Sequence, residues 1–130
     1  MGQPRTELVR EIIDALNRAD VAALLACVDP DFEWRTLESS PAAGVYRGHE
    51  EVRAYVEDWL ATFEGLRIEV DEMTETGDQV LAVVHGRARG RGSGIEVENR
   101  YCQLWTLQDG AAVGMQEYET REQALAGLGG

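Results

Sequence analysis

Apolar residues recur at helical spacing over three segments in the first half of the chain. The first predicted helix covers residues 6–18; the second follows Asp20, which suits a helix N-cap, and ends at Pro30. The third begins near Gly48, and we expect Gly65 to stop it. The three apolar stripes consist of Leu8, Val9, Ile12, Ile13 and Leu16, of Val21, Leu24, Leu25 and Val28, and of Val52, Val56, Trp59, Leu60 and Phe63, with Tyr55 at the edge of the last.

The rest of the chain has patterns typical of strands. Residues 32–36 alternate enough to form one strand, and a polar loop at residues 39–41 follows it. Residues 120–123 read T-x-x-Q, a capping box that begins a terminal helix. Helices first and antiparallel strands afterwards indicate an α+β domain with helices on one face of a sheet. Four further strands are expected at residues 66–75, 79–91, 94–107 and 112–119.

The segment at residues 87–100 predicts its own strand pairing. Residues 92–93 are a Gly-Ser pair suited to a type II′ turn between two antiparallel strands. Extending the pairing from that turn brings opposite charges together twice, at Arg89/Glu96 and at Arg87/Glu98. Because opposite charges directly across a sheet stabilise it, their coincidence supports this register.

The other face of this hairpin sets small residues opposite large side chains with polar tips. The large residues are Asn99, Tyr101, Gln103 and Trp105, opposite Gly86, Val84, Ala82 and Val80. A sheet that is simply packed would carry more Leu and Ile here, so the row indicates a cavity that can orient a ligand. The alternative is that Tyr101 and Trp105 are ordinary core aromatics that hydrogen-bond to their neighbours.

The next hairpin allows two registers. A two-residue turn would pair Cys102 with Glu117 and turn this glutamate outward, whereas a three-residue loop would pair Tyr101 with Glu117. Val113 and Met115 are apolar and share a face with Glu117 at period two, so we prefer the second register. Glu117 would then lie inside the cavity, where burial raises its pKa and a hydrogen bond from Tyr101 partly counters the rise.

Charge and composition narrow the range of partners. Acidic residues outnumber basic ones 24 to 12, and the net charge of −12 repels nucleic acid and anionic lipid. No apolar run approaches the ~18 residues of a membrane span and no signal-peptide pattern is present, so we expect a cytoplasmic protein without a membrane partner. His49 and His85 lack zinc-site spacing, and Cys27 and Cys102 are expected to be buried thiols. We therefore expect no metal and no cofactor.

Five stretches that span nearly the whole chain carry a resemblance to a known family. They are LLACVDPDFEW (24–34), GVYRGHEEVRAYVE (44–57), GRGSGIEVE (90–98), LWTLQDG (104–110) and EYETREQALAGLG (117–129). The chain resembles the SnoaL-like branch of the nuclear-transport-factor-2-like superfamily. The resemblance implies one SnoaL-like domain over residues 1–130, with an ordered core of about 6–126. It also implies a cone-shaped α+β roll, in which a strongly curved, mostly antiparallel sheet and three helices enclose a pocket and a short helix ends the chain.

Ketosteroid isomerase, a member of the same superfamily, uses an Asp base and an oxyanion hole of Tyr and a protonated Asp. The resemblance places Gln103 at the oxyanion-hole Asp and either Arg35 or Thr36 near the base. None of these residues is a carboxylic acid, so we do not expect that mechanism here.

Two functions from different classes remain open. The first is a cofactor-independent isomerase, cyclase or hydrolase of a small apolar carbonyl or epoxide compound, with Glu117 as base and Tyr101 and Gln103 as donors to a developing oxyanion. The second is a non-catalytic ligand-binding or dimerisation module, in which Glu117 only satisfies a buried partner. The residues expected to contact the ligand are Trp34, Tyr46, Trp59, Asn99, Gln103, Trp105 and Met115.

The outer face of the sheet predicts a homodimer. Leu81, Val83, Cys102 and Leu104 lie together on that face, and four apolar side chains on a solvent-facing sheet would form an association site. Members of the superfamily commonly dimerise through this face.

Overall fold

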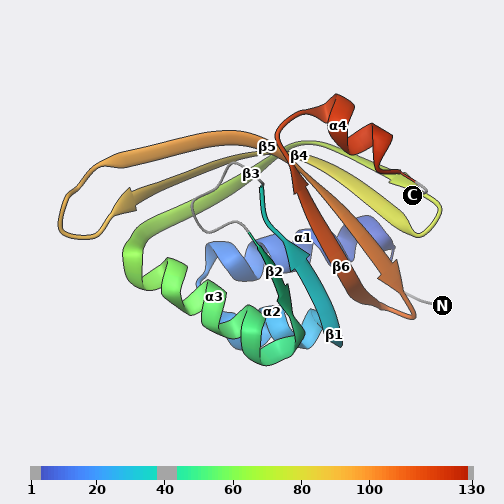
Figure 1. Cartoon of the computed structure of the whole chain (residues 1–130), viewed down its shortest axis with the longest axis horizontal. Helices are drawn as coiled ribbons and strands as arrows, with labels where there is room; N and C mark the ends of the chain where they lie inside the picture. Colours follow the sequence, from blue (N-terminus) through green and yellow to red (C-terminus); the bar gives the residue numbers. More distant parts are fainter. Residues whose placement is uncertain (1–3, 38–43, 129–130) are drawn as a thin grey trace.

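Helices come first in the chain and most of the sheet comes afterwards, as the apolar pattern predicts. The computed structural model describes residues 4–37 and 44–128, so the polar loop predicted at residues 39–41 lies outside the described residues. The elements in chain order are α1 (Arg5–Asn17), α2 (Val21–Cys27), β1 (Val28–Arg35), β2 (Val45–Arg47), α3 (Gly48–Thr62), β3 (Phe63–Thr76), β4 (Gln79–Gly90), β5 (Glu96–Gln108), β6 (Ala111–Tyr118) and α4 (Arg121–Ala126) (Figure 1).

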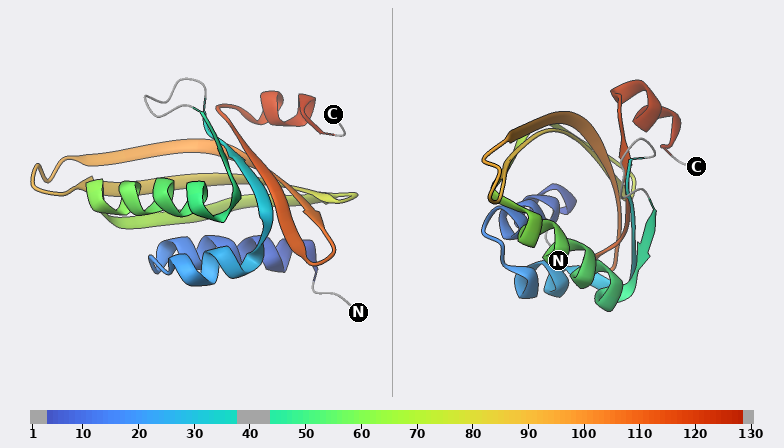
Figure 2. Two further views of the ribbon diagram at one scale, coloured as in Figure 1. Left: turned by 60° about the horizontal axis from the view of Figure 1, so that its bottom comes forward. Right: turned by 60° about the vertical axis from the view of Figure 1, so that its left-hand side comes forward.

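The strands form a single curved sheet in the order β2-β1-β6-β5-β4-β3, in which only the β1–β6 pair is parallel. The sheet bends around α1, α2 and α3, which cover its concave face, while α4 lies on the opposite side (Figure 2). The core fills the space between the three helices and the sheet, and its largest fully buried side chains are Trp105, Phe32, Ile12 and Leu24. The predicted α+β roll with a strongly curved, mostly antiparallel sheet is therefore confirmed.

The predicted start of α2 is confirmed, but the predicted ends of α2 and α3 are wrong. Asp20 caps α2 as predicted, because its side chain accepts a hydrogen bond from the Ala23 backbone N–H at 3.0 Å. Pro30 does not end this helix: α2 gives way to β1 at Val28, and the proline lies within the strand. Gly65 does not stop α3 either. The helix ends at Thr62, and the glycine, with φ +65°, lies where the pairing of β3 with β4 is irregular.

The β4–β5 hairpin has the predicted register. Arg87 pairs with Glu98 and Arg89 pairs with Glu96, so the charged residues share the outer face. The inner row is also as predicted, with Asn99, Tyr101, Gln103 and Trp105 opposite Gly86, Val84, Ala82 and Val80. The turn is longer than predicted, since the backbone hydrogen bonds that close it join Gly90 to Ile95 and Gly94 to Gly90.

The β5–β6 hairpin has neither of the two registers considered. Its turn is the two-residue one, with positive φ at both Asp109 and Gly110, but the pairing shifts between Thr106 and Leu107. Val113 is the extra residue of this bulge. The bulge moves Glu117 opposite Gln103 rather than opposite Cys102 or Tyr101. The preferred side for the glutamate is thus right, although the pairing is wrong.

The apolar residues on the outer face of the sheet are not exposed. Leu81, Cys102 and Leu104 are all buried, and they pack with Ala124 of α4 in a second, smaller core. The capping box starts α4 as predicted, since the Thr120 hydroxyl accepts from the Gln123 backbone N–H at 3.2 Å. The expectation of an open apolar patch on this face is wrong, because the chain's own last helix covers these residues. The homodimer itself stays a prediction.

Candidate functional site

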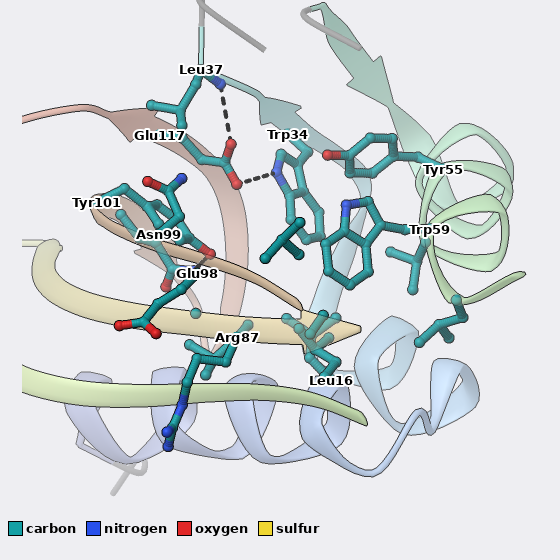
Figure 3. A pocket seen from close by; sticks show the side chains of 18 residues that line it. Leu16, Trp34, Leu37, Tyr55, Trp59, Arg87, Glu98, Asn99, Tyr101 and Glu117 are labelled. Carbon is teal, nitrogen blue, oxygen red and sulfur yellow. Dashed lines mark hydrogen bonds between the residues drawn. The ribbon is translucent and has the colours of Figure 1, made fainter. Parts of the chain in front are cut away.

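A cavity of about 220 Å³ lies between the concave face of the sheet and the helices. Its apolar wall comes from α1 and α3 and from the start of β3, through Leu16, Val56, Leu60, Leu66 and Ile68. Six of the residues predicted for the site line it together: Trp34, Trp59, Asn99, Tyr101, Gln103 and Glu117 (Figure 3). Residues more than 80 positions apart in the chain, such as Trp34 and Glu117, meet here because β1 lies beside β6 in the sheet.

Among the described residues, Glu117 is the only lining carboxylate whose side chain points into this cavity. Its carboxylate accepts two hydrogen bonds, from the Trp34 indole N–H at 3.3 Å and from the Leu37 backbone N–H at 3.1 Å (Figure 3). Burial raises the pKa of Glu117 above its ordinary value, and the bonds from Leu37 and Trp34 partly counter the rise. The predicted direction of this pKa shift is therefore confirmed. The predicted donor is wrong, because the bonds come from Trp34 and Leu37 and not from Tyr101.

Tyr101 belongs to a row of three hydrogen-bonded side chains on the inner face of β5. The Trp105 indole N–H donates to the Gln103 carbonyl oxygen at 3.0 Å, and the Gln103 amide donates to the Tyr101 hydroxyl at 3.5 Å. Gln103 has no exposed surface, so this row is built into the core at one end and reaches the cavity at the other. Burial, the Glu117 charge and Tyr55 all raise the pKa of Tyr101, while the Gln103 bond lowers it, and the net shift is upward. The phenol therefore stays protonated at neutral pH.

Tyr55 of α3 lines the site, although the sequence pattern predicted it only at the edge of the apolar stripe of this helix. It lines the cavity, its ring lies edge-on to Trp34 at a centroid distance of 5.4 Å, and it stacks on Tyr46 at 4.2 Å. Burial, followed by the charge of Glu117 and by Tyr46, raises the pKa of Tyr55, so this phenol also remains a donor. The missed signal was spacing: residue 55 lies one helical turn from both Val52 and Trp59.

Three of the predicted ligand contacts do not line this cavity. Trp105 and Met115 are buried in the core behind it, where they pair across β5 and β6. Tyr46 lies behind Tyr55 and lines a shallow outer groove with Val45, Glu51 and Asp58. Their positions make Trp105 and Tyr46 supports for cavity residues.

Charged residues stand at the rim of the cavity and point away from it. Arg87 pairs with Glu69 on the outer face, and Glu98 contacts His85 at 2.6 Å. Figure 3 shows both side chains directed away from Glu117. Across residues 4–37 and 44–128, no group of three or more His, Cys, Asp or Glu side chains could hold a metal ion. In the same residues every helix is too short or too polar to span a bilayer.

The family profile of the SnoaL-like domain matches residues 9–115, which include every described residue that lines the cavity except Glu117. The chain belongs to the SnoaL-like family. An uncharacterised protein of Mycobacterium tuberculosis is 32% identical over 114 residues, which cover 86% of each chain. This SnoaL-like chain and its mycobacterial relative thus share nearly their full length.

Solved structures show the same fold. An NTF2-like protein of Burkholderia thailandensis superposes with a TM-score of 0.79 at 26% identity, covering 95% of this chain and 98% of its own. TerC, which was crystallised together with polyporic acid, superposes with the same TM-score of 0.79 at 22% identity, covering 97% and 98%. The SnoaL-like chain therefore has the nuclear-transport-factor-2-like architecture over nearly all of its length.

Proposed function

We propose that this SnoaL-like protein binds a small, largely apolar carbonyl compound in the cavity and catalyses proton transfer on it without a cofactor. One observation carries the proposal: the carboxylate of Glu117 lies in a mostly apolar and aromatic cavity where burial raises its pKa. A general base works best when its pKa approaches the working pH, and desolvation moves a carboxyl group in that direction.

The groups around Glu117 can stabilise the negative charge that a proton transfer leaves on the substrate. When Glu117 takes a proton from the carbon beside a carbonyl, the electron pair of the broken C–H bond moves to the carbonyl oxygen. Tyr101 and Tyr55, both kept protonated, are donors on the wall of the same cavity and would stabilise that oxygen. Return of the proton to another carbon completes an isomerisation. In a cyclisation the enolate carbon first bonds to a second carbonyl carbon of the same molecule, and the proton goes to the alkoxide that this attack forms. In a hydrolysis Glu117 would take the proton from water instead.

Size and relatives support a small organic ligand. A cavity of about 220 Å³ admits a compact molecule of one or two rings, and aromatic side chains from β1 and α3 offer it flat apolar surfaces. The structural relative TerC was crystallised with the small molecule polyporic acid.

A second candidate function is non-catalytic binding, and one observation favours it. Both oxygens of Glu117 already accept a hydrogen bond, from Trp34 and from Leu37, so the carboxylate also fastens the end of β1 to β6. A glutamate with only this role would hold the cavity in shape while the ligand is bound unchanged.

Indanone, a flat bicyclic ketone with exchangeable hydrogens beside its carbonyl, separates the two functions. Exchange of these hydrogens in heavy water, followed by proton NMR, reports base catalysis without knowledge of the natural substrate. We expect the protein to accelerate the exchange and Glu117→Gln to lose about 10²–10⁴ of that acceleration. Glu96→Gln, which removes an exposed carboxylate on the outer face, is the matched control and should not change the rate. Binding of indanone without faster exchange would favour the non-catalytic function.

A further inference from the structure

The direction of the hydrogen bonds along β5 is fixed by chemistry at its buried end. An indole N–H can only donate, so the Gln103 atom 3.0 Å from the Trp105 nitrogen has to be the carbonyl oxygen of the amide. The amide nitrogen, which can only donate, is then held on the other side. Because Gln103 is fully buried, it has no solvent to which this nitrogen could turn.

The Tyr101 hydroxyl oxygen therefore accepts a hydrogen bond from the Gln103 amide. The Gln103 nitrogen lies 3.5 Å from the Tyr101 oxygen, a long hydrogen bond, but one whose polarity cannot be reversed while Trp105 holds the amide. Two donors cannot share one hydrogen bond, so the phenol proton has to point elsewhere. Among the described residues Tyr101 makes no second hydrogen bond, and its side chain lines the cavity.

We propose that Gln103, oriented by Trp105, is a positioning residue that makes Tyr101 a donor toward the cavity, so that the site selects ligands with a hydrogen-bond acceptor at this point. The inference rests on the proposed function, because it requires the cavity to bind a small organic molecule. It adds the ligand polarity: an acceptor such as a carbonyl oxygen fits at Tyr101, whereas a group that can only donate, such as an ammonium, would meet the phenol proton.

The test compares indanone with indane, which has the same rings without the carbonyl. The affinity of each probe is measured by calorimetry, and the indanone-to-indane affinity ratio is compared between variants. Because the hydration of each free probe is the same for every variant, it cancels in this comparison. Tyr101→Phe removes the donor and should lower the indanone-to-indane ratio by about two- to tenfold, the usual value of one hydrogen bond. Gln103→Glu keeps the acceptor for Trp105 but presents a second acceptor to Tyr101. The phenol should turn to it, and the ratio should fall by a similar factor.

Two further variants make this result specific. Gln103→Met has a similar length and no charge, and it leaves the phenol free to rotate, so its ratio should fall less than that of Gln103→Glu. Gln108→Glu adds the same charge at an exposed position of β5 and should leave the ratio unchanged. The infrared carbonyl stretch of bound indanone gives an independent readout. It should lie at lower frequency in the unmodified protein and rise in Tyr101→Phe and Gln103→Glu.

The outcomes separate this inference from the proposed function. If both probes bind but the ratio and the stretch are unchanged in both Gln103 variants, Gln103 does not orient Tyr101 and the inference is overturned alone. If neither probe binds to the unmodified protein, the cavity does not take such ligands and the proposed function fails with it. A lower ratio in Gln103→Met alone, should Gln103→Glu not fold, still supports the inference.

Discussion

The two hairpins of the sheet share strand β5 but set their registers by different means. In the β4–β5 hairpin, every described pair from Gln79/Thr106 to Arg89/Glu96 follows one unbroken register. In the β5–β6 hairpin, the register changes by one residue next to Leu107. A one-residue change exchanges the two faces of a strand, so a small irregularity decides which side chains face the cavity.

The comparison shows what holds the candidate base inside. From its two-residue turn alone, β6 would set Glu117 opposite Cys102 on the outer face. The extra residue Val113 moves it to the inner face beside Gln103. Bulges are common next to functional sites because they redirect a side chain in this way. The site thus depends on the irregular hairpin, while the regular one supplies the fixed row of partners.

Inserting one alanine between Val113 and Gly114 should have the largest effect. A further residue turns both Met115 and Glu117 to the outer face, which empties part of the core and removes the base. We expect a loss of several kcal/mol of stability, since a buried Met→Ala change alone costs about 2–5 kcal/mol. In indanone exchange we expect the loss of about 10²–10⁴ predicted for Glu117→Gln.

Deleting Val113 is the matched control for that insertion. The deletion removes the bulge but leaves Gly114 opposite Thr106 and Glu117 opposite Gln103, so the carboxylate should stay inside. Denaturant unfolding and indanone exchange should both change less than in the insertion variant. Equal losses of stability and of exchange rate in the two variants would show that both properties depend on the bulge itself and not on the face where Glu117 lies.

The outer face of β5 offers a second contrast, between Ala124 and Ala126 of α4. Ala124 is fully buried against Leu81 and Leu104, whereas Ala126 is exposed. Ala124→Asp buries an unpaired charge and should cost roughly 3–5 kcal/mol in denaturant unfolding. It should also cause concentration-dependent association in sedimentation, because it uncovers an apolar patch. Ala126→Asp should stay close to the unmodified protein, and similar behaviour of both variants would contradict the covering role of α4.

The stability of the protein should also depend on pH through Glu117. Its pKa is higher in the folded state than in the unfolded chain, where it is about 4.3. Keeping the ionised carboxylate in the cavity is therefore costly at neutral pH, and the cost disappears as the pH falls through the folded pKa. The free energy of unfolding, compared with that of Glu117→Gln, should rise on acidification by at most about 1.4 kcal/mol per pH unit. A difference that falls on acidification would mean a lowered pKa.

The smallest effect on stability is expected for a charge pair on the outer face of the β4–β5 hairpin. Arg89 and Glu96 lie 3.6 Å apart and are mostly exposed, with side-chain exposures of 56% and 79%. Such a pair contributes about 0–1 kcal/mol, so Arg89→Ala should shift the unfolding midpoint only slightly and leave the cross-strand pairing intact. Backbone amide NMR contacts across β4 and β5 can verify the pairing. Loss of the register in this variant would show that the charges, rather than the backbone and core, hold the hairpin.

The sequence was informative where several local signals agreed. The β4–β5 register could be predicted because two charge pairs and the turn supported the same alignment. The bulge at Val113 could not, since a valine fits a regular strand as well as a bulge and only the pairing with β1 and β5 selects it. The covering of Leu81 and Leu104 by α4 was missed because a six-residue helix does not reveal in its own sequence where it docks.

The most direct test of the account is the titration of Glu117 itself. Carbon-13 NMR of labelled glutamate carboxyl groups, with Glu117→Gln to assign the signal, gives its pKa with and without indanone. We expect a pKa above the ordinary value of about 4.3 and a shift of the signal when indanone binds, because the carboxylate faces the cavity. A pKa at or below that value, with a signal that does not respond to indanone, would contradict the assignment of Glu117 as the base of this site.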